Sequence, residues 1–243
     1  MKFFTILLLV YSHYTLAASD DGVVLNVAVA ANFRAPFLLV RDHFENQSHN
    51  GVSPTFGSSG LLVAQIRQGA PFDIFLSADA ARPGALVDDG YAEPPATTYA
   101  EGRIALWTPG RKASPSSIGN NRLAIANPAL APYGQAAAQC LRRLGLWASV
   151  EPNLIYGNNV SQVNHFVTAS AVTAGFIALS QLRSAQTPDE HYWLCPRSYH
   201  DPIDQQAVVL TASTKTNAAR GFLNFLTDSK TQSLIAALGY PRR

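Results

Sequence analysis

The segment LNVAVAANFRAPFLLVRDHF, residues 25–44, joins a strand pattern to a helix pattern through one short turn. Its first seven residues are apolar except for Asn26, which is typical of a buried strand. From Phe33 onward, large apolar side chains return every three or four residues, which indicates a helix. Asn32 lies between the two patterns, and asparagine is a favoured N-cap residue. We therefore expect a strand, a cap at Asn32 and a helix.

The same order of strand, turn and helix recurs along the chain, although the sequence itself does not repeat. Strands that alternate with helices predict an α/β protein with mainly parallel sheets. Residues 184–204 are expected to form a long connection, and Pro54 places its strand at a sheet edge. Further strands are expected at residues 52–56, 73–78, 103–108, 123–126, 153–156, 174–179 and 208–211, and further helices at 61–68, 135–144, 160–170, 217–227 and 231–238.

Length and charge exclude several classes of protein. The chain has 243 residues, of which 47% are hydrophobic and 14% charged. This composition is too apolar for a disordered chain. The net charge is +2 and the basic residues are scattered, so the sequence lacks the basic stripe that nucleic-acid binding requires.

The first 18 residues differ from the rest and are typical of an export signal. Lys2 gives a basic start, residues 3–10 are almost entirely apolar, and Ala17 and Ala18 provide small residues for cleavage. The apolar run is shorter than the roughly 20 residues that a membrane helix needs. We predict a signal peptide at residues 1–18 and an exported mature protein; a buried first helix is the alternative.

The chain has two cysteines, Cys140 and Cys195. An oxidising compartment permits a disulfide between them, but their separation in sequence does not show that their Cα atoms come close enough. Two buried free thiols are the alternative. Because two cysteines without a CxxC spacing do not predict a zinc site, we expect no protein-ligated metal ion, and we also expect no cofactor.

Four turns are candidates for ligand binding because each leads from an expected strand to a helix, where α/β sheets bind ligands. Helix starts expose backbone N–H groups and the positive end of the helix dipole, so several together can bind an anion without Lys or Arg. Ser58, Ser59 and Asn32 would add side-chain donors. The turns are residues 31–32, 57–60, 131–134 and 157–160.

Catalytic signatures are missing from the sequence. Residues 57–61 lack the G-x-S-x-G spacing of a hydrolase nucleophile, no Gly-Lys pair marks a phosphate loop, and none of the six histidines belongs to an HExxH motif. We therefore expect a binding protein rather than an enzyme. An exported serine hydrolase that uses Ser58 or Ser59 is the alternative from another class.

Six segments match a known pattern: VAVAANF (27–33), FGSSG (56–60), QIRQGAPFDIFLSAD (65–79), IANPALAPYG (125–134), GNNVSQ (157–162) and GFIAL (175–179). Together they resemble the family of periplasmic molybdate-binding proteins, the solute receptors of ABC importers, over essentially the whole mature chain. The resemblance implies a type II periplasmic-binding-protein fold, with two α/β lobes joined by two crossings and the anion in the cleft. The implied lobes are residues 19–104 with 205–243, and residues 105–204.

The resemblance also implies which residues bind the anion. These are Asn32, the hydroxyl and backbone of Ser59, and the backbone N–H groups of Tyr133 and Val160, with Ala31 and Ser58 as secondary candidates. Some family members carry a hydroxyl residue at the position of Ala31 and a tyrosine at that of Ala178. This chain has neither hydroxyl, so it offers a smaller or differently distributed set of contacts.

The function that the resemblance implies is capture of molybdate, and also tungstate, in the periplasm by a monomeric receptor that delivers it to an ABC transporter permease. The candidate site offers donors and no carboxylate. Hydrogen phosphate carries an O–H donor that would meet no acceptor there, at a cost of about 1–3 kcal/mol. Sulfate is fully ionised, so only cavity size can exclude it, and a receptor for sulfate or another tetrahedral oxyanion is the alternative.

Overall fold

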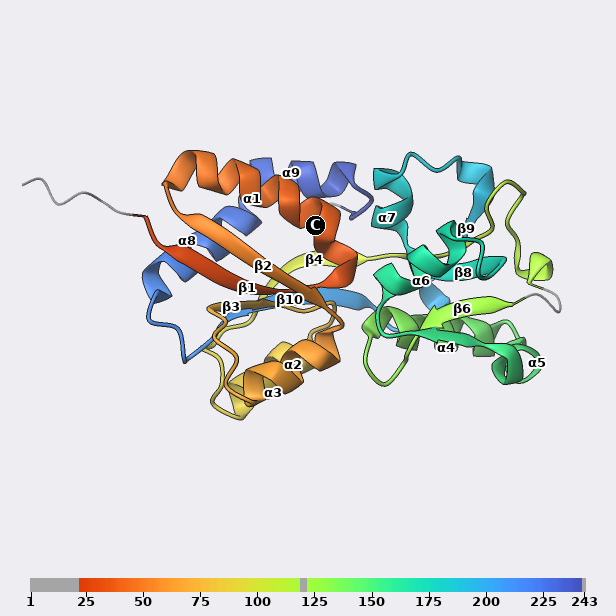
Figure 1. Ribbon diagram of the computed structural model, residues 1–243, viewed down its shortest axis with the longest axis horizontal. Coiled ribbons are helices and arrows are strands. Elements are labelled where there is room, and N and C mark those ends of the chain that lie inside the picture. Colours follow the sequence, from red (N-terminus) through yellow and green to blue (C-terminus); the bar gives the residue numbers. More distant parts are fainter. Residues whose placement is uncertain (1–21, 119–121, 242–243) are drawn as a thin grey trace, which may run out of the picture.

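Residues 22–118 and 122–241 are described by the computed structural model, which consists of two α/β lobes side by side (Figure 1). The predicted signal peptide, residues 1–18, lies outside these residues. Within the described ranges, no helix is long and apolar enough to cross a membrane. The same residues contain no group of three or more His, Cys, Asp or Glu side chains arranged to hold a metal ion.

The first lobe is built on a five-stranded sheet in the order β2-β1-β3-β10-β4. β1 lies between the parallel strands β2 and β3, whereas β10 runs antiparallel to β3 and β4. Helices cover both faces, with α1, α8 and α9 on one and α2 and α3 on the other (Figure 1). The elements are β1 (Val24–Ala30), α1 (Arg34–Ser48), β2 (Gly51–Gly57), α2 (Ser59–Arg67), β3 (Ile74–Leu76), α3 (Ala81–Asp88), β4 (Thr97–Gly102), β10 (Ile203–Val209), α8 (Thr216–Thr227) and α9 (Ser229–Ala237).

The second lobe repeats this plan around a sheet in the order β7-β6-β8-β5-β9. β6 lies between the parallel strands β7 and β8, and β5 runs antiparallel to β8 and β9. A disulfide joins Cys140 on α4 to Cys195 just after β9. The two cysteines are therefore not free thiols, which was the alternative. The elements are β5 (Ile104–Trp107), β6 (Leu123–Ala126), α4 (Pro132–Arg143), α5 (Trp147–Val150), β7 (Ile155–Gly157), α6 (Val160–Thr168), β8 (Ala174–Ala178), α7 (Leu179–Ser184) and β9 (Tyr192–Leu194).

The chain passes between the lobes where β4 ends at Gly102 and β5 begins at Ile104, and it returns before Ile203 begins β10. Gly102 and Ile203 are paired neighbours, so the two crossings lie side by side. Each strand that begins at a crossing, β5 and β10, runs antiparallel to its neighbours. The sheets are therefore mixed, rather than mainly parallel as predicted. The exact lobe bounds given above stay a prediction.

Several local predictions were wrong. Asn32 is not the N-cap of α1: residues Ala31–Phe33 form a short 3-10 turn, and Phe33 occupies the cap position. The strand expected at 208–211 lies at Ile203–Val209 and takes in the end of the supposed long connection. The sequence patterns also did not predict β4, β9, α3, α5 and α7. β4 forms because it pairs with β10, about a hundred residues away in sequence, and a local pattern does not reveal such pairing. Pro54, by contrast, does lie in an edge strand, β2.

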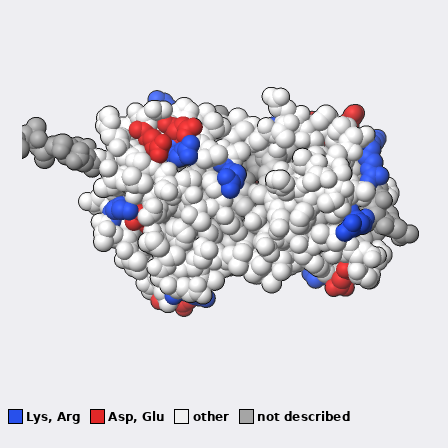
Figure 2. All heavy atoms as spheres, viewed as in Figure 1, with Lys and Arg blue, Asp and Glu red and all other residues white. Residues whose placement is uncertain are grey.

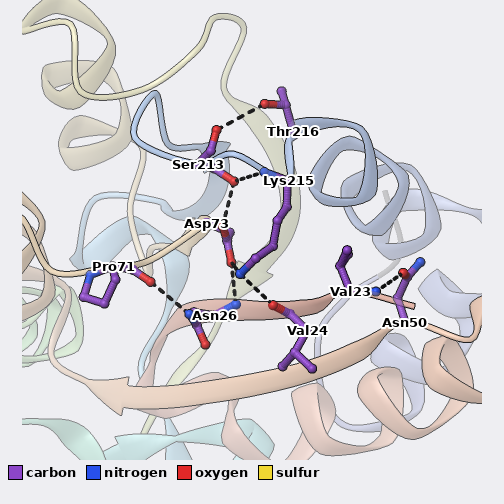
Figure 3. A network of polar contacts seen from close by, with 9 residues as sticks. All are labelled: Val23, Val24, Asn26, Asn50, Pro71, Asp73, Ser213, Lys215 and Thr216. Atoms are coloured by element: carbon purple, nitrogen blue, oxygen red, sulfur yellow. Dashed lines mark hydrogen bonds and ion pairs between the residues drawn. The ribbon is translucent and has the colours of Figure 1, made fainter. Parts of the chain in front are cut away.

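A buried carboxylate ties three segments of the first lobe together (Figure 3). Asp73, only 4% exposed, accepts hydrogen bonds from the backbone N–H of Asn26 at 2.7 Å and the Ser213 hydroxyl at 2.7 Å. Asp73 also forms an ion pair with Lys215 Nζ at 3.0 Å. The same ammonium group donates a second hydrogen bond, to the Val24 carbonyl at 2.8 Å. Burial alone would raise the pKa of Asp73, but the hydrogen bonds and Lys215 outweigh it, and the net pKa is lowered.

We predict that Asp73→Asn lowers the free energy of unfolding at pH 7 by about 2 kcal/mol, because it removes hydrogen bonds to a charged group. The folded-state pKa lies below the unfolded value of about 4, so this stabilisation is present above that pH and is lost as pH falls through the folded pKa. Urea denaturation of both proteins from pH 7 to pH 3 measures the difference. The difference in free energy of unfolding between the two proteins should become smaller in acid. The exposed control Asp42→Asn should change the free energy of unfolding little at any pH. A constant difference would contradict the assignment.

Candidate functional site

A small cavity lies between the lobes where the carboxyl ends of β1, β2, β6 and β7 face one another. The space between its lining atoms is about 200 Å³, part of which is open to solvent. All six candidate residues from the sequence line it, although they come from both lobes: Ala31, Asn32, Ser58, Ser59, Tyr133 and Val160. Among the described residues that line the cavity, none is an acid, a lysine, an arginine or a histidine. The cavity therefore offers polar groups without formal charge.

The start of α2 presents two donors, both from Ser59. Ser58 is the N-cap, and its hydroxyl accepts the N–H of Leu61 at 3.4 Å. The N–H of Gly60 donates across the lobes to the Leu130 carbonyl at 2.9 Å, which leaves the Ser59 N–H as the next donor of the first turn. The Ser59 hydroxyl accepts from the N–H of Ala78 at 3.0 Å. Its own hydrogen is therefore available for an acceptor in the cavity.

The start of α4 presents the N–H of Tyr133. Pro132 occupies the first helical position and has no N–H, while the N–H of Gly134 donates to the Ala131 carbonyl at 2.9 Å. Tyr133 therefore carries the remaining N–H donor of this first turn. Gly134 is required here, because a Cβ on it would lie 2.1 Å from the Ala126 carbonyl oxygen.

The start of α6 presents the N–H of Val160. Asn159 is the N-cap, and its side-chain oxygen accepts the N–H of Gln162 at 3.0 Å. Asn159 also lines the cavity, and the sequence analysis did not single it out. The signal was available, because an asparagine directly before a helix pattern is a typical cap.

The side chain of Asn32 does not donate into the cavity, contrary to expectation. It is 3% exposed, and its amide nitrogen donates to Gln205 Oε1 at 2.8 Å and to the Tyr240 hydroxyl at 3.0 Å. Both amide hydrogens are thereby engaged. The Asn32 carbonyl accepts from the hydroxyl of Ser180, a residue of the second lobe, at 3.1 Å. Asn32 therefore links the lobes, and it also lines the cavity.

The Tyr133 side chain reaches from α4 to the crossing between the lobes. A Cβ on Gly102 would lie 2.4 Å from its hydroxyl oxygen. This hydroxyl is buried and makes no hydrogen bond of ordinary geometry among the described residues, although Tyr240 and Asn32 lie beside it. Burial, and then the neighbouring Tyr240, raise the pKa of Tyr133 well above its usual range. The hydroxyl therefore stays neutral, and the backbone and side chain of Tyr133 face different surroundings.

Comparison with known proteins agrees with this geometry. Residues 25–241 match the family described as bacterial extracellular solute-binding protein. The chain belongs to this family. The match takes in both lobes and all four helix starts, and the expected two-lobe type II fold is confirmed.

Two curated members of the solute-binding family share more than a third of their residues with this chain. It is 37% identical over 219 residues to the molybdate-binding protein ModA of Rhodobacter capsulatus, covering 88% of this chain and 86% of that protein. It is 35% identical over 233 residues to the ModA of Azotobacter vinelandii, covering 93% and 92%. The solved periplasmic molybdate-binding protein of Azotobacter vinelandii superimposes with a TM-score of 0.84 at 34% identity, covering 89% of this chain and 98% of that one.

We predict opposite effects for removing two neighbouring hydroxyls. Tyr133→Phe removes a buried hydroxyl that makes no hydrogen bond of ordinary geometry, so the free energy of unfolding should stay unchanged or rise by about 1 kcal/mol. Tyr240→Phe leaves the Asn32 amide and the Ser180 hydroxyl short of a partner and should lower it by about 1–3 kcal/mol. Urea denaturation of the two variants tests this pair. Equal losses would show that the Tyr133 hydroxyl is hydrogen-bonded.

Proposed function

We propose that this protein is a receptor that captures molybdate, and also tungstate, for an ABC importer. The observation that carries the proposal is a neutral cavity lined by Ser59, Tyr133 and Val160, which lie at the starts of three helices. We propose that their N–H groups and the Ser59 hydroxyl bind the anion. Asn32, Ala31 and Ser58 complete the proposed site. The molybdate-binding names of the relatives support the choice of anion.

Uncharged donors suit an anion that has no proton to give. Each buried N–H that lacks an acceptor costs about 1–3 kcal/mol, so an occupant with acceptors on all sides relieves several such costs at once. Molybdate, tungstate and sulfate are tetrahedral dianions of this kind. Hydrogen phosphate is disfavoured because its O–H would face donors with no carboxylate to accept it.

Hydrolysis by Ser58 or Ser59 is not favoured by the site. Each of these hydroxyls accepts a main-chain N–H, and no histidine lines the described cavity. A serine nucleophile needs a base within hydrogen-bond reach. We propose a non-enzymatic, monomeric receptor without a cofactor that works in the periplasm after removal of its signal peptide and delivers the anion to the membrane permease.

Calorimetric titration with molybdate, tungstate, sulfate and phosphate tests the proposal. We expect tight binding of the first two anions and no measurable binding of phosphate. Tight binding of sulfate with weak binding of molybdate would support the sulfate-receptor alternative. Equal binding of phosphate and molybdate would contradict a site made only of donors.

We predict that Ser59→Ala weakens molybdate binding by about 1.5–3 kcal/mol, the range for a hydrogen bond to a charged group. The dissociation constants of the two proteins, measured by calorimetry at the same ionic strength, give this value. Ser53→Ala, on the exposed side of β2, is the matched control and should leave the constant unchanged. An unchanged constant for Ser59→Ala would remove this hydroxyl from the site.

A further inference from the structure

Two surface grooves flank the cavity on opposite sides of the junction between the lobes. The first, here called the α1–α6 groove, is lined by residues of α1, α6 and α7, including Arg34, Ser161, His165 and Gln181. The second, here called the α2–α3 groove, is lined by residues of α2, α3 and the loop before α4. Each groove offers an anion an approach to the cavity.

The two grooves differ in charge. The α1–α6 groove is lined by Arg34 and His165 and by no acidic residue among those described. Arg34 takes part in none of the ion pairs within the described ranges; its guanidinium lies over the Phe56 ring at 3.9 Å. In Figure 2, which shows this face, no acidic side chain lies beside the junction of the lobes. An approaching anion therefore meets a net positive charge here.

The α2–α3 groove offers an anion much less attraction. It is lined by three acidic residues, Asp79, Asp201 and Asp204. Its two arginines are already paired, Arg67 with Asp89 at 2.5 Å and Arg82 with Asp79. Asp79 offsets Arg82 and Asp89 offsets Arg67, so Asp201 and Asp204 leave this rim with a net negative charge, which repels a dianion.

The contacts that close the cavity also differ between the two sides. Toward the α2–α3 groove the lobes meet through the Gly60 N–H, which donates to the Leu130 carbonyl at 2.9 Å, and through Arg82 Nη2, which donates to the Ala129 carbonyl at 3.4 Å. Toward the α1–α6 groove the cavity shares Ala31, Asn32 and Asn159 with the groove itself. The contact across the lobes there is made by a side chain, because the Ser161 hydroxyl donates to the Ala31 carbonyl at 3.0 Å. The Ser161 hydrogen bond is therefore a contact that breaks on this side when the lobes part.

We propose that the anion enters and leaves through the α1–α6 groove and that Arg34 draws it in. The proposal rests on the anion-receptor function proposed above. Arg34 does not line the cavity, so its charge acts on the approach and the departure more than on the bound anion. Removing it should slow association and dissociation together, and the dissociation constant should change less than either rate.

The test is stopped-flow tryptophan fluorescence with molybdate at roughly 10 mM and at about 1 M ionic strength, where the screening length falls from about 30 Å to about 3 Å. Arg34→Gln should slow association about three- to fivefold at low salt and hardly at all at high salt. Arg67→Gln makes the same change of charge in the α2–α3 groove and should have little effect. Asn164→Asp adds a negative charge to the α1–α6 groove without changing side-chain size and should slow association in the same way.

Two outcomes would overturn the proposal. One is equal slowing by Arg34→Gln and Arg67→Gln, and the other is an association rate that neither Arg34→Gln nor Asn164→Asp changes at low salt. If calorimetry shows that tungstate or sulfate binds and molybdate does not, the anion that binds is used in the stopped-flow test. The expected effects are the same, because attraction to Arg34 depends only on the negative charge of the anion. If none of the three dianions binds, both this proposal and the anion-receptor function are refuted.

Discussion

Backbone N–H groups that a helix start leaves without a partner are the constraint on which the junction of the lobes depends. Helix starts from both lobes face one cavity because the strands that lead to them end at the same place. The constraint also selects small residues. Gly60 and Gly134 stand where a Cβ would lie 2.9 Å and 2.1 Å from carbonyl oxygens, so the helix starts approach their neighbours only with glycine there. Donors held this closely by main chain need no side-chain charge to present a positive face.

Asn32 joins the cavity to the contact between the lobes. Its backbone belongs to the turn after β1, its amide is held by Gln205 and Tyr240, and its carbonyl accepts from Ser180 of the second lobe. The same residue therefore lines the cavity and bridges the lobes. A change in how the lobes meet would shift the donors around the cavity, which is the coupling that a receptor with a closing cleft requires.

Local patterns predicted the parts of the fold and site that depend on neighbours in sequence. Residues 25–31 read as a buried strand because each side chain reports its own surroundings, and the four turns were found because caps and glycines lie beside the helices they begin. The role of Asn32 was misjudged because Gln205 and Tyr240, which engage its amide, lie 173 and 208 positions away. The partners of β4 and of Cys140 also lie far away in sequence, about a hundred positions for β4 and 55 for Cys140.

The position of β10 has a consequence for how the chain reaches its folded state. β10 fills the gap between β3 and β4, yet it follows the whole second lobe in sequence. Until residues 203–209 have left the ribosome, β3 and β4 are strand edges without their shared neighbour. The first sheet therefore closes only near the end of synthesis, and the first lobe stays incomplete while the second lobe is being made.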